Sequence, residues 1–150
     1  MSGRPAGDLL QARRAIAAFA RALAGLPDAA LDGAHGGRLR AAAAAIGCGA
    51  RSLANAIAFA RTGLEPEGSE AAPVPAEAMA RAATLPAAAL RNLCTHAHAH
   101  LDAEWRDLDA AGWQVPVQAG EGPPVAAAET PRLWTAALMH ATGVLAAAAA

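Results

Sequence analysis

The sequence predicts an all-α protein, a four-helix bundle that forms a single domain over residues 1–150. Apolar residues make up 55% of the chain and charged residues 17%, which is enough apolar surface for a core and too little charge for disorder. Alanine, the residue with the highest helix propensity, is very common. Four long segments carry apolar residues at helical spacing, and no long segment alternates as a strand does.

The first helix is expected at residues 7–26 and the second at 38–61. The first has one apolar face, formed by Leu9, Leu10, Ile16, Phe19, Leu23 and Leu26. A short turn at 28–31 and a loop at 33–37 follow it. The second helix, which Gly63 should end, has two nearly opposite apolar stripes: Leu39, Ile46, Leu53 and Ile57, and Ala41, Ala45, Cys48, Ser52, Asn55 and Phe59. It should therefore be buried by several neighbours.

A proline-rich connection at 64–85, with a short helix at 76–83, should lead to the third helix. So long a crossover means that the second and third helices need not be antiparallel. The third helix is expected at 84–110, with Thr84 as its cap, Pro86 in its first turn and Gly112 after its end. Its core stripe would be Leu90, Leu93, Cys94, Ala97, Leu101, Trp105 and Leu108.

The loop at 113–129 could hold a small hairpin, 114–117 against Val125. The fourth helix begins at Thr130-Pro131 and runs to near the end of the chain. Its expected core face is Leu133, Ala137, His140 and Val144. Residues 133–150 carry no charge and approach the length of a membrane span, but their alanine content and central histidine favour a buried bundle helix and no membrane contact.

The net charge and the cysteines indicate which class of partner to exclude and which cellular compartment to expect. The formal net charge of -1 argues against a nucleic-acid surface, which normally has a basic excess. The two cysteines, Cys48 and Cys94, lie far apart and lack zinc-ribbon spacing, which predicts free thiols in a cytoplasmic protein. The first residues contain no continuous apolar run, so no signal peptide is expected.

His140 is a single histidine in an otherwise apolar helix. The preferred interpretation is a hydrogen-bonded core histidine, and the alternative is a metal ligand or a base. A second candidate is the stripe His96, His100 and Glu104, spaced i, i+4, i+8, which could chelate a divalent ion but is expected on a solvated face. His98 and Asp102 form a separate pair, expected to be a surface hydrogen bond.

Four segments together resemble the mycothiol-dependent maleylpyruvate isomerase family of the DinB superfamily. They are LAGLPDAALD, GGRLRAAAAAIGCGARSLANAIAFARTG, LDAAGWQVPV and PRLWTAALMHATGVL. The resemblance implies an up-down-down-up bundle with a long middle crossover. It also implies a divalent metal, usually zinc, held by a histidine on the second long helix and a Glu-xxx-His or His-xxx-His pair on the last. The positions that match are Ala45, Ala136 and His140, so one ligand of three remains.

Three hypotheses follow, and the sequence leaves open whether the chain is an enzyme. In the first, the metal site has degenerated and the chain is a non-catalytic binding protein, with a second copy in a homodimer as its expected partner. In the second, it is a metal-dependent thiol transferase or isomerase whose site has moved to His140 and Cys48, with His96 or His100. In the third, a small molecule occupies a metal-free pocket lined by Ala45, Cys48, Trp134 and Ala136.

Overall fold

The structure is a computed structural model, and it describes residues 3–64 and 74–149. The central part of the predicted 64–85 connection therefore lies outside the described residues. Four long helices form the bundle: α1 (Ala6–Gly25), α3 (Gly37–Thr62), α5 (Ala87–Asp107) and α6 (Thr130–Ala149). Two short helices, α2 (Asp28–Asp32) and α4 (Ala76–Ala82), lie in the connections. The predicted all-α bundle is confirmed.

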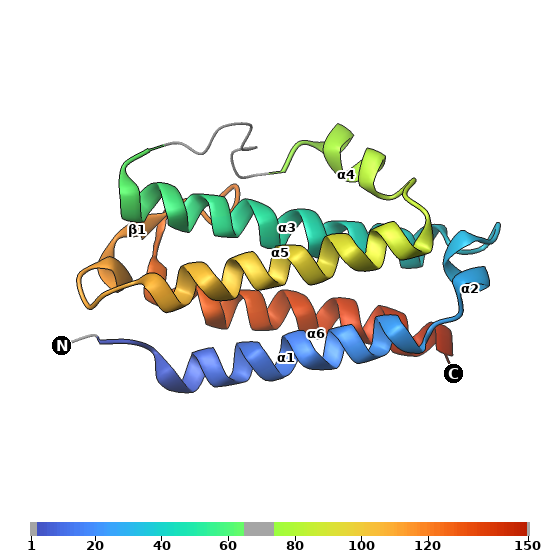
Figure 1. Ribbon diagram of the computed structural model, residues 1–150, viewed down its shortest axis with the longest axis horizontal. Helices are drawn as coiled ribbons and strands as arrows, with labels where there is room; N and C mark the ends of the chain where they lie inside the picture. The colour runs from blue at the N-terminus through green and yellow to red at the C-terminus, as the bar shows by residue number, and fades with distance from the viewer. Residues whose placement is uncertain (1–2, 65–73, 150) are drawn as a thin grey trace.

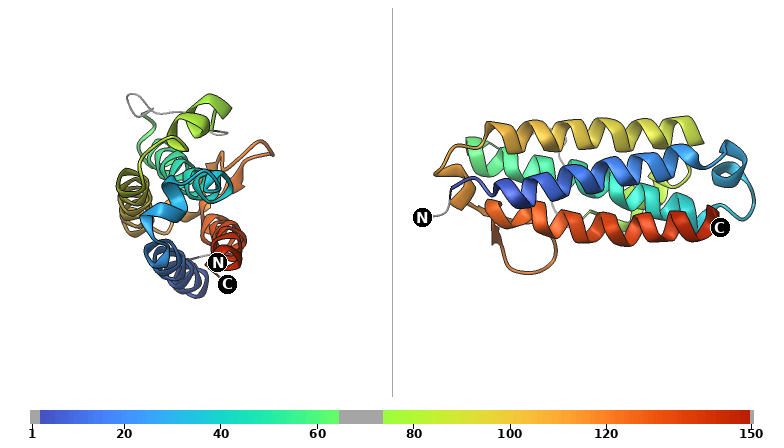
Figure 2. Two further views of the ribbon diagram at one scale, coloured as in Figure 1. Left: turned by 90° about the vertical axis from the view of Figure 1, so that its right-hand side faces the viewer. Right: turned by 90° about the horizontal axis from the view of Figure 1, so that it is seen from below.

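The long helices lie as two close pairs, α3 with α5 and α1 with α6 (Figure 1). Helices α1 and α6 run in one direction and α3 and α5 in the other, so each close pair is parallel. Seen end-on in Figure 2, the four helices stand at the corners of a quadrilateral, α1–α6–α3–α5. The sides α3–α6 and α1–α5 join the two pairs and are packed less closely.

Glycine explains why α3 and α5 approach so closely. A Cβ atom on Gly47 would lie 2.7 Å from Cγ of Leu93 and 3.4 Å from Sγ of Cys94, both on α5. The sequence suggests that Gly47 weakens its helix, since glycine costs about 1 kcal/mol relative to alanine in a helix interior. The structure shows the compensation, because the missing side chain leaves room for the facing helix.

The predicted ends of the helices are confirmed at some positions and wrong at others. Gly63 ends α3 in the left-handed conformation, with φ of 73°, and its N–H donates to the Phe59 carbonyl at 2.8 Å. Thr84 does not cap α5. Its hydroxyl donates to the Arg81 carbonyl, and Asp32 of α2 accepts the Ala87 N–H at 3.0 Å instead. A cap supplied from 55 residues away is not visible in local sequence.

The predicted third helix is also too long at its far end. Helix α5 ends at Asp107, followed by Leu108 in extended conformation, and Gly112 begins a short 3-10 turn (Gly112–Gln114). The predicted hairpin is present as two short antiparallel strands, β1 (Pro116–Val117) and β2 (Val125–Ala126), with Val117 opposite Val125. A second 3-10 turn (Ala127–Glu129) leads into α6.

The core face of α6 differs from the prediction. The buried residues are Thr130, Pro131, Trp134, Leu138, Ala141 and Leu145, whereas Leu133, Ala137 and His140 are exposed. Because the helix is uncharged after Arg132, polarity does not mark its outer side. The face with the larger apolar side chains, Trp134, Leu138 and Leu145, packs inward because it removes more apolar surface from water.

Helix α3 also differs from its prediction on one side. The stripe containing Ala41, Ala45 and Phe59 is exposed at those three positions, while the opposite stripe, Leu39, Ile46, Leu53 and Ile57, is buried. Among the described helices, α3 is long and apolar enough to cross a membrane by composition, with a mean hydropathy of 1.3. More than half of that window, 56%, is buried in the bundle, as expected for a core helix.

Candidate functional site

A groove runs along the α3–α6 side of the bundle, with a volume of about 680 Å³. Ala45, Gly49 and Leu53 of α3 form one wall, and Leu133 and Ala137 of α6 form the other. The loop between β1 and β2 and residues Val74 and Met79 close parts of its rim. The volume lies within the range of small-molecule sites, roughly 300–1,000 Å³.

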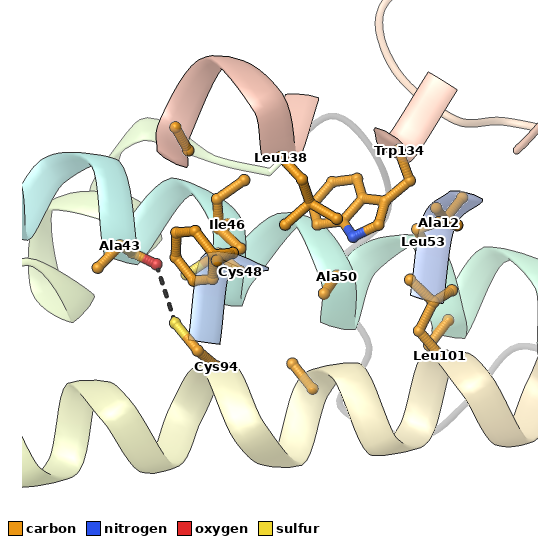
Figure 3. Packing of buried hydrophobic residues seen from close by; sticks show 14 of the residues in the cluster. Ala12, Ala43, Ile46, Cys48, Ala50, Leu53, Cys94, Leu101, Trp134 and Leu138 are labelled. Carbon is orange, nitrogen blue, oxygen red and sulfur yellow. Dashed lines mark hydrogen bonds between the residues drawn. The ribbon is translucent and has the colours of Figure 1, made fainter. Parts of the chain in front are cut away.

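The indole of Trp134 extends from α6 over α3 and forms part of this groove. A Cβ atom on Gly49 would lie 2.9 Å from Cη2 of Trp134, so glycine at this position lets the ring lie against the α3 backbone. Figure 3 shows the indole above Ala50 and Leu53. The two glycines of the Gly47-Cys48-Gly49 sequence therefore leave room on two faces of α3, Gly47 for α5 and Gly49 for Trp134.

Two polar features stand out in the apolar lining. The Ser52 side chain is 6% exposed, and its hydroxyl oxygen has no hydrogen-bond partner among the described residues. The charged residue in the lining is Glu121, which lies in the exposed loop between the strands. The groove is thus apolar, with a carboxylate at the rim.

Beneath the groove, Trp134 is tied to a buried histidine of α5. Its indole N–H donates to Nε2 of His98 at 3.1 Å, and the two ring centroids are 5.9 Å apart. The imidazole also meets Phe19 of α1 edge-on, with centroids 6.2 Å apart. Since Nε2 accepts a hydrogen bond, the proton of the neutral ring lies on Nδ1. His98 therefore links three of the long helices.

The protonation of His98 follows from this environment. Burial lowers the pKa of His98 from 6.5 to about 4, and a hydrogen bond with the backbone of Cys94 acts in the opposite direction. The prediction that His98 makes a surface hydrogen bond with Asp102 is wrong. The Asp102 carboxylate instead accepts from Nε of Arg13 at 2.8 Å. An aromatic cluster spanning three helices carries no local sequence signal.

The structure separates the residues predicted to hold a metal. His140 and Ala136 are exposed on the outer side of α6, and they do not line the groove. The prediction that His140 lies on the core face is wrong. Ala45 and Trp134 do line the groove, whereas Cys48 faces a smaller cavity of about 260 Å³ beside α4, together with Ser52 and Asn55.

The alternative metal-binding stripe, His96, His100 and Glu104, lies on α5, and its carboxylate already has a partner. His96 and His100 are exposed, as expected, but Glu104 is buried, with 8% exposure. Its carboxylate accepts from Nη2 of Arg61 at 3.2 Å, and Nε2 of His100 is 3.6 Å away. The Arg61 guanidinium, on α3, thus pairs with the Glu104 carboxylate that would be the third ligand of a metal ion held by this stripe.

Both cysteines are buried thiols that form no disulfide, as predicted. The Cys94 thiol donates to the Ala43 carbonyl at 3.3 Å (Figure 3). Burial, followed by the nearby Cys48 thiol, raises the pKa of Cys94 to about 12, against a weaker opposing effect of the Gly47 backbone. Cys94 is therefore a protonated thiol at neutral pH, and a protonated thiol is a poor nucleophile.

The donor set does not fit the metal that the family resemblance implies. Two of the three matching positions are alanines, and catalytic zinc sites normally use three protein ligands. Within residues 3–64 and 74–149, no three His, Cys, Asp or Glu side chains are grouped so that they could hold a metal ion. No chemical step through a metal is therefore derived for this chain.

Comparison with known proteins gives matches at the level of structure. No protein-family model matches the chain, and no curated protein matches it. A crystal structure of the mycothiol-dependent maleylpyruvate isomerase matches with a TM-score of 0.75 and 28% identity. The crystal structure of a histidine-to-alanine variant of that enzyme matches with a TM-score of 0.76 and the same identity.

The two matches cover 94% of this chain but 62% of each isomerase chain, so this chain spans less than two thirds of their length. The fold and the 28% identity therefore support the resemblance of this chain to the maleylpyruvate isomerase-like family of the DinB superfamily.

Proposed function

We propose that this chain binds a small, neutral and largely apolar molecule in the α3–α6 groove, without a metal ion and without catalysing a reaction. The observation that carries the proposal is the groove of about 680 Å³ that is lined by Ala45. The family resemblance implies a histidine ligand at that position. Alanine there removes a ligand and leaves apolar surface in its place.

The lining favours a neutral ligand over a charged one. Its large side chains are Leu53, Leu133 and Trp134, and burying apolar ligand surface against them contributes about 25 cal/mol per Å². The carboxylate of Glu121 at the rim disfavours an anion.

The test uses two probes with the same ring and different charge, 1-naphthol and 1-naphthoate, titrated into the protein by calorimetry. We expect 1-naphthol to bind more tightly than 1-naphthoate. Ala137→Phe places a ring in the groove and should abolish binding of 1-naphthol. Ala136→Phe is the matched control, since Ala136 is exposed on the same helix but does not line the groove.

Equal binding of 1-naphthol by the Ala137→Phe and Ala136→Phe variants would refute the assignment of the groove. Tighter binding of 1-naphthoate would refute the preference for a neutral ligand.

The second candidate is a thiol-dependent transferase or isomerase with a relocated site. The likeness to two structures of a mycothiol-dependent isomerase favours it. The positions of Cys48, buried on α3, and His140, exposed on the outer side of α6, argue against a shared site. Mycothiol-dependent turnover of maleylpyruvate that is lost in Cys48→Ala or His140→Ala would favour this candidate over the binding protein.

A further inference from the structure

A second groove lies on the other open side of the bundle, between α1 and α5. These helices lie side by side in the right-hand view of Figure 2. The groove has a volume of about 520 Å³ and shares no described lining residue with the α3–α6 groove. His98 and Cys94 form part of its floor. Apart from Thr95, the walls between its ends are apolar, formed by Ile16, Phe19, Ala20, Leu23, Ala24 and Ala99.

Charged side chains lie at both ends of this apolar surface. At one end, Nε of Arg13 donates to Asp102 at 2.8 Å, and Arg106 also lies 3.6 Å from the Asp102 carboxylate. At the other end, Arg91 donates to the Leu26 carbonyl at 2.6 Å and pairs with Asp28. Of these groups, Arg13, Arg91 and Asp102 line the groove, so its lining carries an excess of one positive charge.

Arg13 is the cation best placed to meet a ligand. It lines the groove, and its side chain is 40% exposed. The Arg13 contact with Asp102 uses Nε, and no hydrogen bond of its terminal nitrogens is found within the described residues. Asp102 keeps Arg106 as a partner if Arg13 turns toward an anion. Arg91 is fixed by the end of α1 and is less free to reorient.

We propose that the α1–α5 groove binds an elongated apolar monocarboxylate, with its carboxylate at Arg13 and its apolar chain along Phe19 and His98. The single negative charge matches the single excess positive charge of the groove. From Arg91 to Asp102 the groove follows about 16 Å of α5, at 1.5 Å per residue, which suits a chain better than a compact ring. His98 offers an uncharged aromatic surface there, because its nitrogens are directed to Trp134 and the helix backbone.

The experiment titrates decanoate, octanoate and decanol into the intact chain by calorimetry. Decanoate should bind about 15-fold more tightly than octanoate, since each buried methylene contributes about 0.8 kcal/mol. Arg13→Met should weaken decanoate binding roughly tenfold or more, the range of a charge-assisted hydrogen bond, and leave decanol binding within twofold. Arg14→Met is the matched control, since Arg14 is its exposed neighbour and does not line the groove.

The site of binding is tested separately. Ala99→Phe, at an exposed position in the groove wall, should abolish decanoate binding, whereas the groove-filling Ala137→Phe on α6 should leave it unchanged. In ¹H–¹⁵N spectra of the Ala137→Phe variant, whose α3–α6 groove is filled, decanoate should still shift the indole N–H signal of Trp134, because that N–H donates to His98 in the floor of the α1–α5 groove. The Trp134→Phe variant assigns that signal.

Three results would overturn the proposal. The first is equal binding of decanoate by the Arg13→Met and Arg14→Met variants. The second is binding that Ala137→Phe removes and Ala99→Phe does not, which would place the ligand in the α3–α6 groove. The third is a dimer in sedimentation velocity that Ala99→Phe converts to a monomer, which would assign the groove to a second copy of the chain.

Discussion

The buried His98 should make the stability of the bundle depend on pH. Its folded-state pKa of about 4 lies below the unfolded value of 6.5, so between these values the unfolded chain binds a proton that the folded chain does not. The contribution to stability is fully present above pH 6.5 and is lost as the pH falls toward 4. Between pH 8 and pH 5 the loss amounts to about 2 kcal/mol.

The assay is urea unfolding at pH 8 and pH 5 of the wild type and the His98→Phe variant. Removing the imidazole leaves the Trp134 indole N–H without its acceptor, a cost of about 1–3 kcal/mol at both pH values. The informative quantity is therefore the difference in pH dependence. The wild type should lose about 2 kcal/mol more than the variant between the two pH values.

The comparison with the variant also removes the contribution of other titrating groups. Those nearest to His98 on its own helix are Cys94, one turn before, and Asp102, one turn after and paired with Arg13. Phe19 and Trp134, which pack on the ring from α1 and α6, do not titrate in this range. Equal pH dependence of the two proteins would refute the assignment of His98 as a buried neutral acceptor.

Two further predictions concern packing and buried hydrogen bonds. Gly47→Ala should lower the free energy of unfolding by about 1 kcal/mol, because the cost of overpacking against Leu93 exceeds the gain in helix propensity, whereas Gly143→Ala, with no atom within 4 Å, should raise it by a similar amount. A stabilising Gly47→Ala in urea unfolding would contradict the close approach of α3 and α5. Thr130→Val should cost about 1–3 kcal/mol, because the fully buried Trp105 indole N–H donates to the Thr130 hydroxyl at 3.1 Å. Thermal unfolding indistinguishable from wild type would contradict that hydrogen bond.

Much of the fold could be predicted because the helical periodicity is strong and the breaks between helices are marked. Gly63 and the Thr130-Pro131 pair bound two of the long helices close to their predicted ends. The register of α6 could not be predicted. Apolar residues occur on all sides of this helix, so its sequence does not show which face is buried. The prediction chose the face of Leu133, which includes His140, whereas the structure buries the face of Leu138.

Less of the candidate site than of the fold could be predicted from the sequence. Four residues were expected to line one pocket: Ala45 and Trp134 line the α3–α6 groove, whereas Cys48 and Ala136 do not. The importance of His98 depends on Phe19 and Trp134, which are brought to it only by the folded bundle. Glu104 and Arg61 are 43 residues apart, so their pairing was also invisible locally.

The most direct test of the central claim is a zinc titration of the wild type, followed by calorimetry on protein prepared without a histidine tag. We predict no stoichiometric zinc binding by the wild type, because His140 lies exposed on α6, away from Ala45 in the groove, and zinc sites normally need three protein ligands. Stoichiometric zinc binding by the wild type would contradict the loss of the metal site and the metal-free function proposed for the α3–α6 groove.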